Sequence, residues 1–177
     1  MPATVRRLST YRFRDTDRLL FDANIWLFLY SPQYGPSDSR VRVYSAALKQ
    51  VLAARVPIFI DALILSEFFN TWARFAYNRS QPKSVDFKTY RNSSAFIPIA
   101  KAISDACRRM LRCATRIESD FTSLDMNALL SSYASGKIDF NDQVIAKPCN
   151  QHGLTVVTHD ADLRGLTLNL LTEKHAC

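Results

Sequence analysis

Leu19-Leu20-Phe21-Asp22 is the most informative segment of this chain for its fold class. Three apolar residues followed at once by an acid are typical of a buried strand that ends at a polar edge. The pattern returns near the other end of the sequence, where residues 154–157 lead through two polar residues to Asp160. Two more apolar runs, 57–60 and 168–171, are also expected to be strands, and Pro57 stands at a first position where proline is tolerated.

Stretches of helical periodicity separate these strands. Helices are expected over residues 37–54, 62–77, 99–110, 125–133 and 141–151. Pro148 must kink or end the last of them, and a short strand is expected over 117–121. Strands that alternate with helices and read as solid apolar runs imply a mostly parallel sheet covered on both faces. The sequence therefore predicts an α/β protein, a three-layer α/β/α sandwich.

The chain has 177 residues, enough for one compact domain, and carries a formal net charge of +7. Residues 1–17 are expected to form a basic N-terminal arm, and residues 18–177 the domain itself. Excess Lys and Arg attract polyanions, which makes nucleic acid a reasonable partner. An acidic protein or a membrane surface would explain the charge equally well.

The four cysteines contain no CxxC pair, so reduced thiols are expected rather than a structural zinc site. The longest apolar run near the N-terminus, residues 25–30, is far too short to span a bilayer. We therefore expect a cytoplasmic protein without a membrane anchor.

Four acids follow predicted strands or stand early in predicted helices. Asp22 and Asp160 follow strands, Asp142 lies in the first turn of a helix, and Glu67 lies on the polar side of another. In open parallel sheets, ligands bind beyond the carboxyl ends of the strands, where these acids can converge. Carboxylates so placed repel one another, and Mg²⁺ or Mn²⁺ would remove that repulsion.

Each of these acids also has a simpler interpretation. Asp22 could be a helix cap, and Asp142 could favour the positive end of its helix. Glu67 could be a solvated helix residue, and Asp160 could start a turn. The order and spacing of the set, rather than any single member, indicate a metal site.

Here the sequence resembles the PIN-domain ribonuclease family, especially VapC-type toxins of type II toxin–antitoxin systems. The resemblance lies in four short blocks that occur in family order, Leu20-Phe21-Asp22-Ala23-Asn24-Ile25-Trp26-Leu27, Leu65-Ser66-Glu67-Phe68, Asp142-Gln143-Val144-Ile145-Ala146 and Gly153-Leu154-Thr155-Val156-Val157-Thr158-His159-Asp160-Ala161-Asp162-Leu163. It implies a PIN-like fold over residues 18–177.

The resemblance also implies roles for individual residues. The metal-binding and catalytic acids would be Asp22, Glu67, Asp142 and Asp160. Polar residues that support them would be Asn24 and Thr158, and Asp139 would be an auxiliary contact. The activity implied is hydrolysis of RNA by an endoribonuclease that uses Mg²⁺ or Mn²⁺. The partners implied are an RNA substrate, an antitoxin protein and a second copy in a homodimer.

Substrate contacts are suggested by basic residues. Arg74 shares the polar stripe of its helix with Glu67, so we expect it to bind substrate. A second set could hold a phosphate backbone or could be merely a solvated or antitoxin-binding face. That set is Lys101, Arg108, Arg109, Arg112 and Arg116.

Two other functions stay open at this point. A catalytically inactive PIN-like module could bind RNA or protein without cutting, although all four acids are present. A phosphatase of the haloacid-dehalogenase type also begins with an aspartate after the first strand. That chemistry usually has a second Asp two residues later, where this chain has Asn24.

Overall fold

A six-stranded sheet forms the centre of the protein, seen here in a computed structural model that describes residues 4–80, 85–136 and 138–174. Every strand pairing is parallel, and the strand order is β1-β6-β5-β2-β3-β4. The strands are β1 (Thr4–Arg7), β2 (Leu19–Phe21), β3 (Ile58–Ile60), β4 (Ala114–Arg116), β5 (Thr155–Val157) and β6 (Asn169–Thr172). All carboxyl ends therefore lie at one edge of the sheet.

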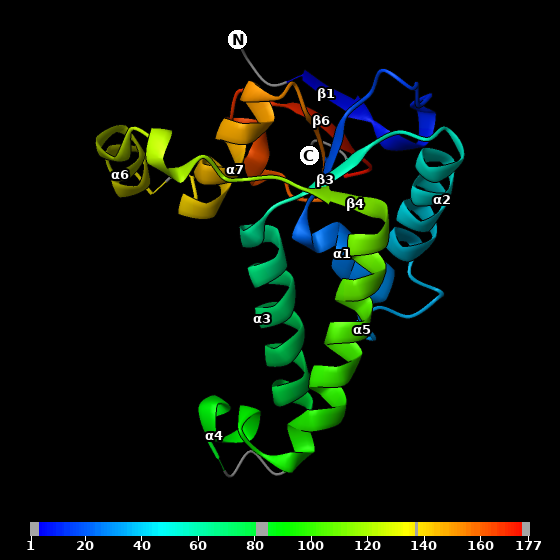
Figure 1. Ribbon diagram of the computed structural model, residues 1–177, viewed down its shortest axis with the longest axis vertical. Helices are drawn as coiled ribbons and strands as arrows, with labels where there is room; N and C mark the ends of the chain where they lie inside the picture. The colour runs from blue at the N-terminus through cyan, green and yellow to red at the C-terminus, as the bar shows by residue number, and fades with distance from the viewer. Residues whose placement is uncertain (1–3, 81–84, 137, 175–177) are drawn as a thin grey trace.

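Helices connect the strands and cover the sheet. They are α1 (Ala23–Tyr30), α2 (Ser39–Ala53), α3 (Ala62–Arg79), α4 (Phe87–Arg91), α5 (Ile97–Cys113), α6 (Met126–Ala134) and α7 (Phe140–Gln151). Short 3-10 turns are η1 (Leu8–Thr10), η2 (Ser94–Phe96), η3 (Phe121–Ser123) and η4 (Asp162–Gly165). Helices α3 and α5 run side by side away from the sheet, with α4 at their far end (Figure 1).

The handedness of the connections divides the helices into two layers. The chain passes from β2 to β3 to β4 in one direction across the sheet and then returns to β5. Because crossovers between parallel strands are right-handed, the return puts α6 and α7 on the face opposite α1, α3 and α5. Figure 1 shows α6 and α7 apart from those three helices. The predicted three-layer α/β/α sandwich is confirmed.

The central strands form the core. All three residues of β2 are fully buried, and β3 and β5 on either side of it are almost entirely buried as well. Trp26 of α1 packs against Phe21, with ring centroids 5.3 Å apart. Strands covered on both faces read as solid apolar runs, which is why the sequence reveals them.

The strand expected over residues 117–121 is wrong. The strand β4 lies earlier, at Ala114–Arg116, directly after α5, and Phe121 stands in η3. Arg116, which was expected on the basic helix face, is therefore a strand residue. β4 is an edge strand whose residues are mostly exposed, so it lacks the apolar run that marks a central strand.

Two other regions differ from simple expectation. Helix α7 contains Pro148 but continues to Gln151, and His152 N–H still donates to the Pro148 carbonyl at 2.9 Å. Within the basic segment 1–17, residues 4–7 form the edge strand β1, which pairs with β6. In the described part of the chain, no helix has the length and hydropathy needed to cross a bilayer.

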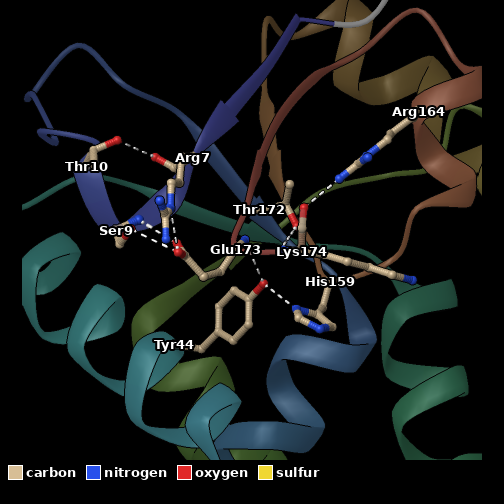
Figure 2. Close-up of polar contacts among 9 residues, drawn as sticks. All are labelled: Arg7, Ser9, Thr10, Tyr44, His159, Arg164, Thr172, Glu173 and Lys174. Carbon is tan, nitrogen blue, oxygen red and sulfur yellow. Dashed lines mark hydrogen bonds and ion pairs between the residues drawn. The ribbon is translucent and has the colours of Figure 1, made fainter. Parts of the chain in front are cut away.

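The Tyr44 hydroxyl ties α2 to the carboxyl ends of β5 and β6. It donates to the Thr158 carbonyl at 3.1 Å and accepts from the Glu173 N–H at 3.3 Å. It also lies 3.0 Å from His159 Nδ1. Figure 2 shows Tyr44 between Glu173 and His159. The ring itself is fully buried, so these contacts replace water that cannot reach the hydroxyl.

We predict that Tyr44→Phe lowers the free energy of unfolding by about 1–3 kcal/mol, because it leaves buried polar partners unpaired. Chemical denaturation followed by circular dichroism measures this. Tyr133→Phe is the matched control, since that side chain is 54% exposed and its hydroxyl bonds to no other described residue. Equal stability of the two variants would contradict a structural role for the Tyr44 hydroxyl.

Candidate metal and nuclease site

The candidate site lies where the order of the strands reverses. β2 leads on to β3 on one side, whereas its neighbour β5 leads on to β6 on the other. Such switch points leave a crevice at the carboxyl ends of the two strands. Asp22 follows β2 directly and Asp160 lies just beyond β5. Asp22 N–H donates to the Val157 carbonyl at 3.0 Å, which extends the pairing of the two strands into the site.

The Asp22 carboxylate is held by three donors. Oδ1 accepts from Ala23 N–H at 2.6 Å, which caps α1, so the simple interpretation of Asp22 as a helix cap is also correct. Oδ2 accepts from the Thr158 hydroxyl at 2.6 Å and from the Asn24 amide. Burial raises the pKa of Asp22, and these hydrogen bonds oppose the rise. Its side chain is therefore fixed in one orientation.

Asn24 and Thr158 connect Asp22 to the end of β5. The Asn24 side-chain oxygen accepts from His159 N–H at 3.1 Å. The Thr158 hydroxyl accepts from Asp160 N–H at 2.9 Å. Both expected supporting residues thus contact the segment that carries Asp160, and Thr158 is fully buried.

Glu67 reaches the site from α3. Partial burial of its carboxyl group, followed by the charges of Asp22 and Asp142, raises its pKa to about 7. Asp139 and Asp160 contribute in the same direction. The field of four other acids therefore acts on this side chain, although the residue as a whole remains exposed.

Asp142 reaches the site from α7, on the opposite face of the sheet. Partial burial, followed by the charges of Asp22 and Asp139, raises its pKa to about 7. Asp160 and Asp162 add to this rise. The four acids singled out in the sequence thus come from four separate segments and share one electrostatic field.

Asp139 and Asp162 lie at the margin of this cluster. Asp139 caps α7 through Asn141 N–H at 2.8 Å. Asp162 N–H donates to Asp160 Oδ1 at 3.0 Å, which orients that carboxylate. Both acids line an open pocket of about 570 Å³ together with Tyr133. The margin of the cluster is therefore open to solvent.

Asp61 is an acid that the sequence analysis did not single out. It follows β3 directly, as Asp22 follows β2, and its side chain is only 2% exposed. Oδ1 accepts from Ile64 N–H at 2.9 Å and caps α3. Asp61 thereby fixes the start of the helix that carries Glu67. Its position immediately after an apolar run was the signal that could have found it.

Arg74 lies away from the acids. It is seven residues beyond Glu67 on α3, roughly 10 Å along the helix axis. Its guanidinium lies 4.8 Å from the centroid of the Phe87 ring of α4. Its role in substrate binding stays a prediction.

The basic face of α5 is partly engaged within the protein. Arg108 pairs with Asp105 at 2.7 Å, and the Arg109 guanidinium lies 5.0 Å from the centroid of the Tyr30 ring. Lys101 and Arg112 remain on this helix, whereas Arg116 lies in β4. The two interpretations of this face, a phosphate-binding surface and a solvated or protein-binding one, both remain.

The donor set fits a hard divalent cation in its chemistry. All the converging side chains are carboxylates, which Mg²⁺ and Mn²⁺ prefer, and Mg²⁺ commonly retains several waters beside its carboxylate ligands. Among the described residues, no group of three or more His, Cys, Asp or Glu side chains is arranged to hold an ion directly. The fit of this site to a divalent cation therefore rests on the mutual electrostatic influence of the acids, and not on a preformed set of coordinating side chains.

Comparison with known proteins gives structural likenesses only. The sequence matches no model of a known protein family and no curated protein. VapBC2 from Rickettsia felis, in a crystal structure with a DNA fragment from its promoter, is similar with a TM-score of 0.53 and 16% identity, over 86% of this chain and 96% of that chain. PAE2754 from Pyrobaculum aerophilum is similar with a TM-score of 0.52 and 16% identity, over 95% and 91% of the two chains.

At 16% sequence identity, these structural similarities establish the fold and do not establish the function. The chain has the PIN-domain fold of VapC-type proteins, as its four sequence blocks implied. Each of the four sequence blocks carries one of the acids discussed above, and the first and last blocks overlap β2 and β5, the two strands at the switch point.

We predict that, without divalent cations, the protein loses stability as the pH rises. Glu67 and Asp142 bind protons more tightly when folded, since their pKa values rise to about 7 from 4.5 and 3.8. The folded state is therefore favoured most below the unfolded values, and this advantage is lost as pH rises through about 7. Thermal melts in EDTA should give a higher Tm near about pH 5 than near about pH 8.

Asp142→Asn should raise Tm at the higher pH and flatten this dependence, because it removes one of the repelling charges. Asp15→Asn is the control, since Asp15 is exposed and lies before β2. An identical pH dependence for wild type and Asp142→Asn would show that the acids do not interact.

Proposed function

We propose that this protein is a cytoplasmic, divalent-metal-dependent endoribonuclease that hydrolyses RNA phosphodiester bonds. The observation that carries the proposal is the shared field of Asp22, Glu67, Asp142 and Asp160 at the switch point of the sheet. Structural networks of acids also perturb pKa values, but this cluster lies at the carboxyl ends of parallel strands, where ligands bind in open sheets. The resemblance to PIN-domain ribonucleases supports RNA as the substrate.

The four acids would hold Mg²⁺ or Mn²⁺. When bound, such an ion makes water a better nucleophile at neutral pH and stabilises the negative charge that develops on the phosphate and the leaving oxygen. Thr158 and Asn24 keep the Asp22 carboxylate in its orientation through the hydrogen bonds described above. Asp61 sets the start of α3 and so positions Glu67. These residues supply the preorganisation that a metal-assisted hydrolysis needs.

We predict that the purified protein cleaves single-stranded RNA with Mn²⁺ or Mg²⁺ and that EDTA abolishes the cleavage. Asp22→Asn and Asp142→Asn should each lower the rate at least about a hundredfold, because each removes a charge that holds the ion. Gel electrophoresis of labelled RNA measures this.

Asp15→Asn is again the matched control and should cleave at the wild-type rate. Cleavage that persists in EDTA, or that survives both site substitutions, would refute the metal-acid mechanism. Metal-dependent RNA binding without any cleavage would instead support an inactive PIN-like module.

In the cell, this nuclease would act as the toxin of a toxin–antitoxin pair. It would bind a cognate antitoxin and form a homodimer. The fold shared with VapBC2 supports this role. The net charge of +7 is consistent with partners that are polyanions or acidic proteins.

We predict that induced expression of the protein in a bacterial host stops growth through its nuclease activity. Growth curves would show arrest for the wild type and for Asp15→Asn, and normal growth for Asp142→Asn at matched protein levels. Arrest by the Asp142→Asn variant would separate the growth effect from RNA cleavage and contradict the toxin mechanism.

A further inference from the structure

A second, basic pocket lies at the same edge of the sheet as the acids. It has a volume of about 350 Å³ and opens between β1, β6 and η4. Its polar lining consists of Arg6, Arg7, Arg164, Thr172, Glu173 and Lys174. Figure 2 shows most of these side chains, with Arg7 and Glu173 on one side and Arg164 and Lys174 on the other.

Glu173 is the only acid among the described residues of this lining, and it is already neutralised. It pairs with Arg7 at 2.7 Å and also accepts from Ser9 N–H at 2.9 Å and from the Ser9 hydroxyl at 3.0 Å. Arg6, Arg164 and Lys174 form no ion pair with another described residue. The pocket therefore presents three cationic side chains that no described acid pairs with.

Arg164 is held in place at one end of its guanidinium. Its Nη2 donates to the Lys174 carbonyl at 2.6 Å, which ties η4 to the end of β6. Its Nε is buried, whereas the residue as a whole is partly exposed, so the terminal N–H groups are the ones that a phosphate would meet. A guanidinium fixed in this way binds phosphate well, because several of its N–H groups point in set directions.

The basic pocket and the acids are joined through both the sheet and the chain. β6 pairs with β5, which leads to Asp160, and β1 pairs with β6. Neighbouring strands lie about 4.8 Å apart, so the ends of β6 and β1 lie roughly 5 and 10 Å from the end of β5. Arg164 follows Asp160 by four residues, through η4. An RNA backbone a few nucleotides long can span this distance.

A cluster of carboxylates repels the polyanion that it is meant to cut. Cationic groups beside it offset that repulsion and hold the chain on one side of the scissile bond. We propose that the basic pocket of Arg6, Arg164 and Lys174 binds a backbone phosphate of the RNA substrate, a few nucleotides from the bond that is cleaved. This inference rests on the proposed function for the identity of the substrate.

The test is equilibrium binding of a fluorescently labelled single-stranded RNA to protein carrying Asp142→Asn, which keeps the RNA intact. Into this background we would introduce Arg6→Ala and Lys174→Ala together. Lys174→Ala leaves the main-chain carbonyl that holds Arg164, so the pocket should keep its shape. Lys88→Ala is the matched control, because Lys88 is an exposed cation on α4 at the far end of the α3–α5 pair (Figure 1).

The double variant should bind the RNA roughly tenfold more weakly, whereas Lys88→Ala should bind like its parent. The slope of log affinity against log salt should fall by about 0.7 for each phosphate that the protein no longer neutralises. Unchanged affinity and slope in the double variant would overturn the inference. Competition by polyglutamate that depends on the same two residues, without their effect on RNA, would also overturn it in favour of an acidic protein partner.

Failure of this inference and failure of the proposed function are distinguishable. If wild-type protein cleaves RNA with Mn²⁺, and the double variant binds like Lys88→Ala in the Asp142→Asn background and cleaves like it in the wild-type background, the pocket assignment is wrong and the nuclease stands. If the wild type never cleaves, but RNA binding still depends on Arg6 and Lys174, the nuclease proposal is wrong and the pocket stands as an RNA-binding site.

Discussion

The hydrogen bond from the Thr158 hydroxyl to the Asp22 carboxylate is the contact on which the site depends. It joins the ends of the two central strands across 136 residues of sequence. Because β2 and β5 are the neighbours at which strand order reverses, this bond spans the crevice itself. The same hydroxyl accepts from Asp160 N–H, so one buried side chain sets the relative positions of the first and last acids of the cluster. A shift of one residue in the pairing of β2 and β5 would undo the contact with Asp22.

The acids converge at a cost to the folded state. Glu67 and Asp142 approach from helices on opposite faces of the sheet, and their raised pKa values measure the free energy needed to ionise them there. A bound cation would offset that unfavourable energy, because its charge favours the ionised carboxylates and cancels their mutual repulsion. On the proposed function, metal affinity and instability without metal would therefore have the same physical source. A more stable arrangement with the acids further apart would bind the ion less tightly.

The sequence reveals the parts of this structure that are buried on both sides. β2, β3, β5 and β6 read as apolar runs, and the acids at their ends could be predicted because parallel strands end at one edge. The edge strands β1 and β4 were not predicted, since their exposed residues carry no such pattern. Asp61 stands directly after an apolar run, as Asp22 does, but it matches none of the four blocks and so was not singled out. The basic pocket was missed because Arg6, Arg164 and Lys174 are far apart in the chain and each resembles an ordinary solvated charge.

Charge is distributed unevenly along this edge of the sheet, with acids at the centre and cations beside them at β6 and β1. The separation of roughly 5–10 Å is comparable to the Debye length of about 8 Å at physiological ionic strength, so the two regions are only partly screened from each other. They would act on a polyanion as one electrostatic unit, in which the cations offset the repulsion of the acids. Raising the salt concentration would screen both regions from an approaching polyanion. An ion bound among the carboxylates would change this balance directly, because it would convert the centre of the edge from repulsive to attractive for phosphate. On the proposed function, such an ion would hold the scissile phosphate at the centre of the edge, and the basic pocket would set the side from which the RNA arrives.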